Sequence, residues 1–162
     1  ARRAVGFDMR VIYYDPMEMK PDPGMNAARV DFETLLEESD FISLHTPLTP
    51  DTRHLIDAEA LSKMKPGAVL VNTSRGPVVD LDALYDSLKS GRLFAAGLDV
   101  AEPEPLPLDH PLFQLDNIVI MPHIASASKT ARDKMSWIAA KNLIAGLKGE
   151  HLPNCVNPQV YR

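Results

Sequence analysis

Ten consecutive residues carry the strongest structural signal in this chain: Val71-Asn72-Thr73-Ser74-Arg75-Gly76-Pro77-Val78-Val79-Asp80. The apolar run before them, Ala68-Val69-Leu70-Val71, is typical of a strand, and a new amphipathic pattern begins at Asp80. In an open α/β sheet, ligands bind beyond the carboxyl ends of the strands. The pattern therefore predicts that Arg75 lies at a ligand-binding edge, where a guanidinium suits a small anionic substrate. The alternative is a solvated arginine in an ordinary strand-to-helix turn.

The composition is that of one soluble globular domain with a sizeable core, since the 162 residues are 45% hydrophobic and 24% charged. A net charge of −5 without a basic run argues against nucleic acid and against an anionic membrane as partners. The single cysteine, Cys155, excludes an internal disulfide framework, fits a reducing compartment and accompanies no metal-ligand spacing. No apolar segment approaches the roughly 18 to 20 residues of a membrane span, and no signal-peptide pattern opens the chain. We therefore expect a cytoplasmic protein without a metal site.

Helical and strand-like patterns alternate along the chain, which predicts an α/β fold with a Rossmann-like, doubly wound parallel sheet. Strands are expected at Arg10–Tyr14, Ala28–Val30, Phe41–His45, Ala68–Asn72, Phe94–Asp99 and Ile118–Met121. Helices are expected at Asp31–Glu37, Asp57–Met64, Leu81–Lys89 with Gly91 as C-cap, and Lys129–Leu147 with Met135, Ile138, Ala139, Leu143 and Ile144 as its buried stripe.

Residues 1–150 are predicted to form a dinucleotide-binding domain, and residues 151–162 a tail that returns toward a substrate domain. The opening residues Ala1–Phe7 read as the end of a helix that runs into a strand. We therefore expect the amino-terminal strand and a glycine-rich loop to be missing from this chain. In the doubly wound order 3-2-1-4-5-6, that strand would lie between the strand ending at Asp15 and the strand Phe41–His45. The chain by itself is expected to be inactive.

Asp15 closes an apolar strand. In a dinucleotide-binding unit, a strand-terminal acid accepts hydrogen bonds from the adenosine ribose hydroxyls. Such an acid favours NAD over NADP because it repels a 2′-phosphate. The alternative is an ordinary polar residue at the end of a strand.

Glu104 and His123 each follow a predicted strand, so parallel strands would bring them to the same edge of the sheet as Arg75. A histidine beside a carboxylate holds its proton more tightly, which suits it to protonate a carbonyl oxygen as hydride arrives at the carbon. A nearby arginine would hold the substrate carboxylate through a bidentate pair. The alternatives are a structural role for His123 and a solvated loop position for Glu104.

Three blocks of this sequence resemble the signature blocks of the D-isomer-specific 2-hydroxyacid dehydrogenases in order and spacing. The blocks are Val71–Asp80, Gly97-Leu98-Asp99-Val100-Ala101-Glu102-Pro103-Glu104-Pro105, and Pro122-His123-Ile124-Ala125-Ser126-Ala127. Leu44–Thr49 and Val156–Pro158 extend the resemblance to nearly the whole chain. The sequence departs from the family pattern at Ala101, where a larger residue is usual, and at Ala125, where glycine is common.

The resemblance implies that Arg75 binds a small 2-oxo acid, that His123 is the acid/base and that Glu104 holds and tunes His123. It also implies an NAD site, with Asp99 near the nicotinamide amide. The residues implied for that site are Asp15, Pro16, Thr46, Pro47, Thr52, Thr73, Ser74, Arg75, Asp99, His123 and Ala125.

An NAD-dependent oxidoreductase that interconverts small 2-oxo and 2-hydroxy acids is therefore expected, together with a homodimer formed through this domain. Glyoxylate or hydroxypyruvate is the preferred substrate, because Gly146–Glu150 before the Asn-Pro tail is similar to that branch of the family. A phosphoglycerate or D-lactate dehydrogenase is the alternative enzyme. An NAD-sensing, corepressor-like binding protein is the alternative from another class.

Overall fold

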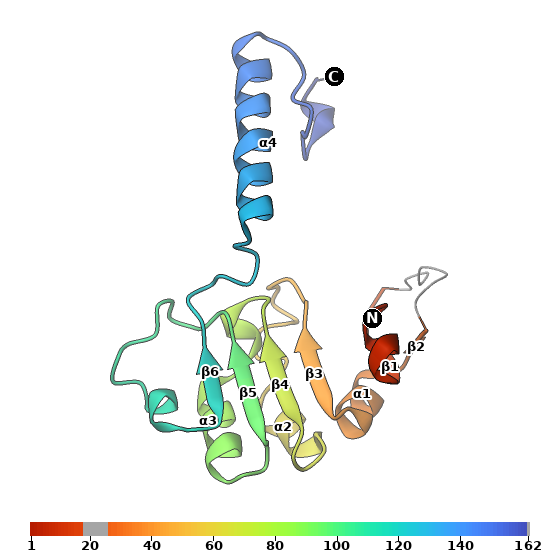
Figure 1. Ribbon diagram of the computed structural model, residues 1–162, viewed down its shortest axis with the longest axis vertical. Coiled ribbons are helices and arrows are strands. Elements are labelled where there is room, and N and C mark those ends of the chain that lie inside the picture. Colours follow the sequence, from red (N-terminus) through yellow and green to blue (C-terminus); the bar gives the residue numbers. More distant parts are fainter. Residues whose placement is uncertain (18–25, 162) are drawn as a thin grey trace. The chain divides into compact units, whose positions relative to one another are not determined.

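The computed structural model describes residues 1–17 and 26–161 and divides into two compact units, Ala1–His123 and Ile124–Arg162 (Figure 1). The strands are β1 (Val11–Tyr13), β2 (Ala27–Arg29), β3 (Phe41–Leu44), β4 (Val69–Asn72), β5 (Ala95–Leu98) and β6 (Ile118–Ile120). The α-helices are α1 (Phe32–Glu38), α2 (Ala58–Lys63), α3 (Leu81–Lys89) and α4 (Lys129–Leu147). Short 3-10 helices are η1 (Ala4–Phe7), η2 (Gly76–Val78), η3 (Pro111–Gln114) and η4 (Pro158–Tyr161).

A parallel sheet of four strands, in the order β3-β4-β5-β6, forms the centre of the first unit. The last residues of these strands lie in one row, because Leu44 pairs with Asn72, Asn72 with Leu98, and Leu98 with Ile120. The predicted α/β fold is confirmed, and each predicted strand is present to within one residue at either end. All four strands therefore release their loops at the same edge, the upper edge of the sheet in Figure 1.

The strands β1 and β2 form a separate parallel pair, from Val11 opposite Ala27 to Tyr13 opposite Arg29. Within the described part of the chain, β1 pairs only with β2, and β3 pairs only with β4. The strands thus form two separate sets, and no described pairing links β1 to β3. The central strand expected between them stays a prediction.

Aspartates begin the three α-helices of the first unit, because each carboxylate accepts backbone N–H groups of the first helical turn. The pairs are Asp31 with Thr34, Asp57 with Ala60, and Asp80 with Asp82 and Ala83, over 2.7 to 3.1 Å. The backbone and side-chain donors of Thr34 also hold the pKa of Asp31 below its ordinary value. At the other end of α3, Ser90 is the C-cap and Gly91 follows it with a left-handed φ of 75°, so a glycine ends this helix as predicted.

Alternate residues of the central strands point into the core, as expected for a sheet covered by helices. Leu70 and Leu98 are buried between the strands and helices, and Leu84 of α3 is fully buried against them. Figure 1 shows α2 and α3 lying on the same side of the sheet. The polar exception in this row is Asn72, which is 0% exposed at the end of β4. A fully buried amide requires hydrogen-bond partners, and its partners lie in the candidate site.

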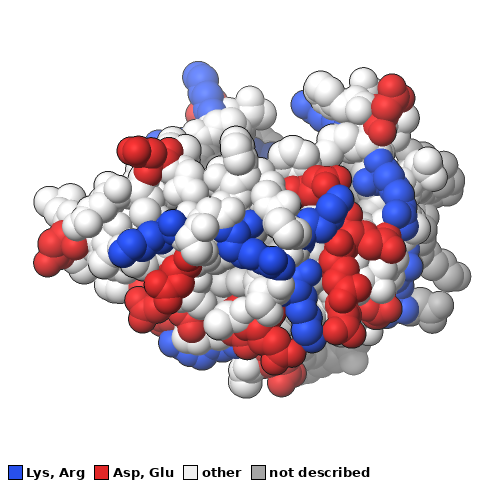
Figure 2. Space-filling model, turned by 90° about the horizontal axis from the view of Figure 1, so that it is seen from below, with Lys and Arg blue, Asp and Glu red and all other residues white. Residues whose placement is uncertain are grey.

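Acidic and basic side chains are mixed on the face seen from below in Figure 2, which looks at the amino ends of the central strands. Lys65 and Asp40 pair there at 2.5 Å, just before β4 and β3 begin. Large fields of one charge sign are absent from the part of this face that the structure describes.

Among residues 1–17 and 26–161, no helix is long and apolar enough to cross a membrane.

The second unit consists of α4 and the tail that follows it. Ser128 caps the helix by accepting a hydrogen bond from the Ala131 N–H, as the predicted start at Lys129 requires. The predicted buried stripe is wrong within this unit, since Met135 and Leu143 are 65% and 64% exposed and Ala145 is the buried residue. The reason is that only the short tail lies beside this 19-residue helix in its own unit. The domain boundary expected after residue 150 stays a prediction.

Candidate functional site

The clearest polar contact at the carboxyl edge of the sheet joins His123 to Glu104. Glu104 lies in the loop after β5, and His123 follows β6 by three residues with a left-handed backbone φ of 54°. The His123 Nδ1 and Glu104 Oε1 atoms are 2.7 Å apart, and both side chains are about half exposed. Because a carboxylate only accepts, Nδ1 donates the hydrogen bond and Nε2 is the ring nitrogen that can exchange a proton with a ligand. The catalytic roles of both residues stay predictions.

A buried amide organises the backbone that carries Arg75. Asn72 donates from Nδ2 to the Arg75 carbonyl at 2.9 Å, while its Oδ1 accepts from the N–H and the hydroxyl of Ser74 at 3.0 and 2.8 Å. The exposed guanidinium of Arg75 donates to the Ser74 carbonyl at 2.7 Å. The backbone at Arg75 is thus held through its carbonyl, independently of the exposed side chain. The convergence of Arg75 with Glu104 and His123 on one cleft stays a prediction.

Gly76 lets the loops after β4 and β5 touch. A Cβ atom at Gly76 would lie 2.0 Å from the Ala101 carbonyl oxygen, which is far inside van der Waals contact. Ala101 is 8% exposed, so its backbone has little room to retreat. Glycine is therefore required here by close approach of two backbones rather than by an unusual φ. This contact sets the spacing between the segment of Arg75 and the loop of Glu104.

We expect Gly76→Ala to lower the free energy of unfolding by roughly 1–3 kcal/mol, since overpacking of a tight contact costs about that amount. The measurement is thermal unfolding followed by circular dichroism. Gly6→Ala is the control, because no atom lies within 4 Å of a Cβ built at Gly6. Equal melting temperatures for Gly76→Ala and Gly6→Ala would show that the two loops can separate without cost.

Asp15, the acid expected to meet the adenosine ribose, follows β1 at the end of the separate strand pair. Its Oδ1 accepts a hydrogen bond from the Met17 N–H at 2.8 Å, across Pro16. Its carbonyl oxygen accepts from the guanidinium of Arg29 at 2.8 Å. Arg29 ends β2, opposite Tyr13, and no local pattern in the sequence associates it with Asp15. A cation therefore accompanies the acid at this strand end.

The loop after β3 and the end of β5 supply further polar groups at the carboxyl edge. Thr52 closes this loop on itself, because its Oγ1 donates to the Pro47 carbonyl at 2.7 Å and accepts from the Thr49 N–H at 2.8 Å. The Oγ1 of Thr46 is buried and has no hydrogen-bond partner among the described residues. Asp99 is 6% exposed, directly after β5. A buried hydroxyl without a protein partner and a buried carboxylate suit a polar ligand such as NAD, so the residues fit that cofactor.

The remaining predicted site residues lie in different surroundings. Thr73 is exposed and Ser74 is buried, both directly after β4. Ala125 belongs to the second compact unit, which is separate from the unit that holds the other predicted site residues. Its place in the cofactor site stays a prediction.

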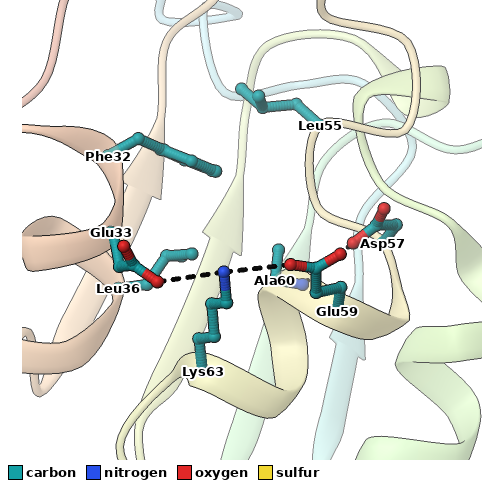
Figure 3. Close-up of a pocket in the computed structure, with 8 residues that line it drawn as sticks. All are labelled: Phe32, Glu33, Leu36, Leu55, Asp57, Glu59, Ala60 and Lys63. Carbon is teal, nitrogen blue, oxygen red and sulfur yellow. Dashed lines mark hydrogen bonds and ion pairs between the residues drawn. The ribbon is translucent and has the colours of Figure 1, made fainter.

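A hollow of about 350 Å³ between α1 and α2 has different chemistry (Figure 3). Lys63 spans its rim and pairs with Glu33 at 3.0 Å and Glu59 at 2.9 Å, and these two carboxylates raise the pKa of Lys63. The lining of this hollow is half apolar and half charged, and none of the predicted site residues belongs to it. Within residues 1–17 and 26–161, no three His, Cys, Asp or Glu side chains gather as metal ligands would.

Sequence reasoning missed three positions that shape this edge. Asn72 carried a usable signal, since a buried strand that ends in an amide followed by small polar residues suggests a capped turn. The close approach of Gly76 to Ala101 and the contact of Arg29 with Asp15 join residues 25 and 14 positions apart, which no local pattern reveals.

Parallel strands with loops at a common carboxyl edge, a strand-terminal aspartate and a cofactor-compatible set of buried polar groups together define a Rossmann-like dinucleotide-binding domain. Residues 1–125 match the family described as "D-isomer specific 2-hydroxyacid dehydrogenase, NAD binding domain". The chain belongs to this family.

Several relatives are similar to the whole chain. A glyoxylate reductase of Korarchaeum cryptofilum is 52% identical over 163 residues, which cover 100% of this chain and 49% of the relative. The glyoxylate/hydroxypyruvate reductase B of Pectobacterium atrosepticum is 49% identical, with 100% of this chain and 51% of the relative covered. The chain thus spans about half the length of the curated relatives it matches.

Solved structures agree with this assignment. The TT0316 protein from Thermus thermophilus has a TM-score of 0.88 at 50% identity, over 96% of this chain and 48% of that one. A D-lactate dehydrogenase with NAD+ from Lactobacillus jensenii has a TM-score of 0.86 at 32% identity, over 96% of this chain and 51% of that one. This chain therefore shares its fold with the TT0316 protein and with a D-lactate dehydrogenase.

Proposed function

We propose that the protein carrying this chain is an NAD-dependent reductase of a small 2-oxo acid, with glyoxylate or hydroxypyruvate as its substrate. The contact of His123 with Glu104 at 2.7 Å is the observation that carries the proposal, because a histidine held by a carboxylate in this way is suited to act as an acid/base. The relatives named glyoxylate reductase and glyoxylate/hydroxypyruvate reductase support the choice of substrate.

Each residue has a distinct task in the proposed reaction. When bound, NADH supplies the hydride. His123 gives the proton from Nε2 to the carbonyl oxygen of the substrate, and Glu104 stabilises the imidazolium and fixes its orientation through Nδ1. Arg75 pairs with the substrate carboxylate, for which its planar fork of donors is suited. Asp15, Thr46 and Asp99 would hold polar groups of the cofactor.

Cellular location and assembly are part of the same proposal. The single cysteine fits a reducing compartment, which supports the cytoplasm. A homodimer would cover apolar side chains such as Trp137 and Leu143, which are 61% and 64% exposed on α4 in its own unit.

The test of the proposed function is turnover by the intact protein with NADH and four acids: glyoxylate, hydroxypyruvate, 3-phosphohydroxypyruvate and pyruvate. We expect the highest kcat/KM for glyoxylate or hydroxypyruvate. Preference for pyruvate would favour a D-lactate dehydrogenase instead, an activity named for a similar structure. NADH binding without turnover of any of the four acids would favour a binding protein over an enzyme.

We further expect the unmodified protein to prefer NADH to NADPH, and Asp15→Ala to narrow that preference. The substitution removes the ribose hydrogen bonds and the repulsion of a 2′-phosphate, and it leaves the Arg29 guanidinium beside the same strand end. The measurement is the ratio of kcat/KM for the two cofactors. Asp116→Ala, which removes an exposed acid before β6, is the control and should leave the ratio unchanged. Equal kcat/KM for NADH and NADPH in the unmodified protein would contradict the role of Asp15.

A further inference from the structure

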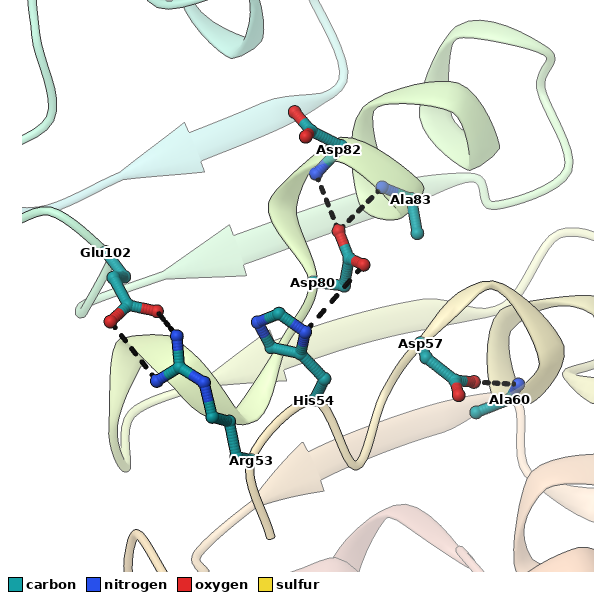
Figure 4. Close-up of polar contacts among 8 residues, drawn as sticks. All are labelled: Arg53, His54, Asp57, Ala60, Asp80, Asp82, Ala83 and Glu102. Carbon is teal, nitrogen blue, oxygen red and sulfur yellow. Dashed lines mark hydrogen bonds and ion pairs between the residues drawn. The ribbon is translucent and has the colours of Figure 1, made fainter. Parts of the chain in front are cut away.

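The loop between β3 and α2 is fastened to the turn that follows Arg75. The His54 N–H donates to the Pro77 carbonyl at 2.8 Å, and Ile56 and Val79 form a parallel bridge between the two segments. His54 has a left-handed φ of 51°, and its Nδ1 lies 3.9 Å from the Asp80 carboxylate (Figure 4). The backbone around residue 53 is thereby held against the segment that carries Arg75.

Arg53 extends from this fastened loop to the loop that carries Glu104. Its Nη1 and Nη2 atoms donate to Oε1 and Oε2 of Glu102 at 3.3 and 2.9 Å, which is a two-pronged arrangement (Figure 4). Paired donors and acceptors of this kind define orientation as well as distance. Glu102 lies two residues before Glu104, whose carboxylate contacts His123.

Because this ion pair is exposed, we infer that it orients the loop rather than adding to the stability of the protein. The Arg53 and Glu102 side chains are 51% and 42% exposed, and exposed ion pairs add little to stability. The loop after β5 is packed at one end, where Ala101 contacts Gly76. Further along, the Glu104 side chain is 40% exposed, so packing alone does not fix its position. Arg53 provides a restraint between these two positions.

We propose that Arg53 is a positioning residue for the acid/base pair: through Glu102 it holds the loop so that Glu104 meets His123 Nδ1. This inference rests on the proposed function. Because Arg53 directly follows Thr52 in the candidate cofactor loop, the same ion pair connects that loop to the acid/base pair.

The test uses Arg53→Met in the intact protein, which removes the guanidinium but keeps an unbranched side chain of similar reach. We expect kcat with glyoxylate to fall about tenfold, because even a small displacement of a reacting group lowers the rate strongly. The KM values for glyoxylate and NADH should stay within about twofold, because the ligand-contacting groups are unchanged. Arg10→Met is the matched control. Arg10 forms a comparable exposed ion pair with Glu38, over 2.8 Å, and this pair lies away from the site.

Two further variants separate positioning from a general structural effect. The charge swap Arg53→Glu with Glu102→Arg should recover most of the lost kcat. In a Glu104→Ala background, where the contact with His123 is already lost, Arg53→Met should lower kcat little further, because both substitutions act on the same contact. Unchanged kcat in Arg53→Met, or a full additional tenfold loss in the Glu104→Ala background, would overturn the proposal.

Failure of the proposed function has a different signature. If the unmodified protein turns over none of the 2-oxo acids, the proposed function fails, and the contact is then followed by nuclear magnetic resonance of the His123 ring N–H. Broadening of that signal in Arg53→Met but not in Arg10→Met would still support positioning. An identical signal in both variants would overturn it.

Discussion

His123→Ala is expected to lower kcat for glyoxylate or hydroxypyruvate reduction by at least about 100-fold in the intact protein, the usual contribution of general acid–base catalysis. Alanine removes the ring nitrogen that delivers the proton and leaves Glu104 without its 2.7 Å partner. The affinity for NADH, measured by calorimetry, should stay similar because most of the candidate cofactor contacts lie on other residues.

His151→Ala is the matched control, since His151 is exposed in the second unit and stacks on Tyr161. It should leave kcat unchanged. Glu104→Gln should give an intermediate loss, because an amide can still accept from Nδ1 but does not stabilise the imidazolium by charge. Near-normal turnover in His123→Ala would remove His123 from the chemistry and with it the main support for the proposed reaction.

Arg75→Met is expected to lower kcat/KM for the 2-oxo acid on the order of 100-fold, mainly through a higher KM. Loss of one partner of a desolvated, charge-assisted pair costs roughly 3 kcal/mol, which corresponds to that factor. The turn itself should survive, because Asn72 holds the backbone at position 75 through the carbonyl and not through the side chain. The measurement is steady-state kinetics with glyoxylate.

Arg75→Lys tests the geometry of the pair. Lysine keeps the charge but not the fork, so it should recover only part of the loss. Arg10→Met again serves as the control for removal of an exposed guanidinium. An unchanged KM in Arg75→Met would show that the carboxylate is bound elsewhere.

Local chemistry explains why much of the fold was predictable. Asp31, Asp57 and Asp80 each precede a helical pattern, and each caps a helix in the structure, because the cap needs only residues two or three positions away. The strands were equally predictable from the sequence, since alternate residues of β3, β4 and β5 are buried on the core side. The parallel order and the common carboxyl edge follow from the alternation of strands and helices.

The buried stripe of α4 marks where that reasoning fails. An apolar stripe predicts that another surface covers it, but the sequence of the helix does not identify that surface. In its own unit the helix meets only the short tail, so Met135 and Leu143 remain exposed. Burial is a property of the assembled surfaces, whereas periodicity belongs to one segment.

The sequence alone determined the strands, the helix starts, the family and the identity of the candidate catalytic residues, because each depends on neighbouring residues or on a recognisable motif. Only the tertiary structure decided how these residues are held. Three long-range contacts hold them: the approach of Gly76 to Ala101, the hydrogen bond from Arg29 to the Asp15 carbonyl, and the ion pair of Arg53 with Glu102. They join residues between 14 and 49 positions apart. Such contacts form only when the strands have aligned, since the register of β3, β4, β5 and β6 brings their loops to one edge.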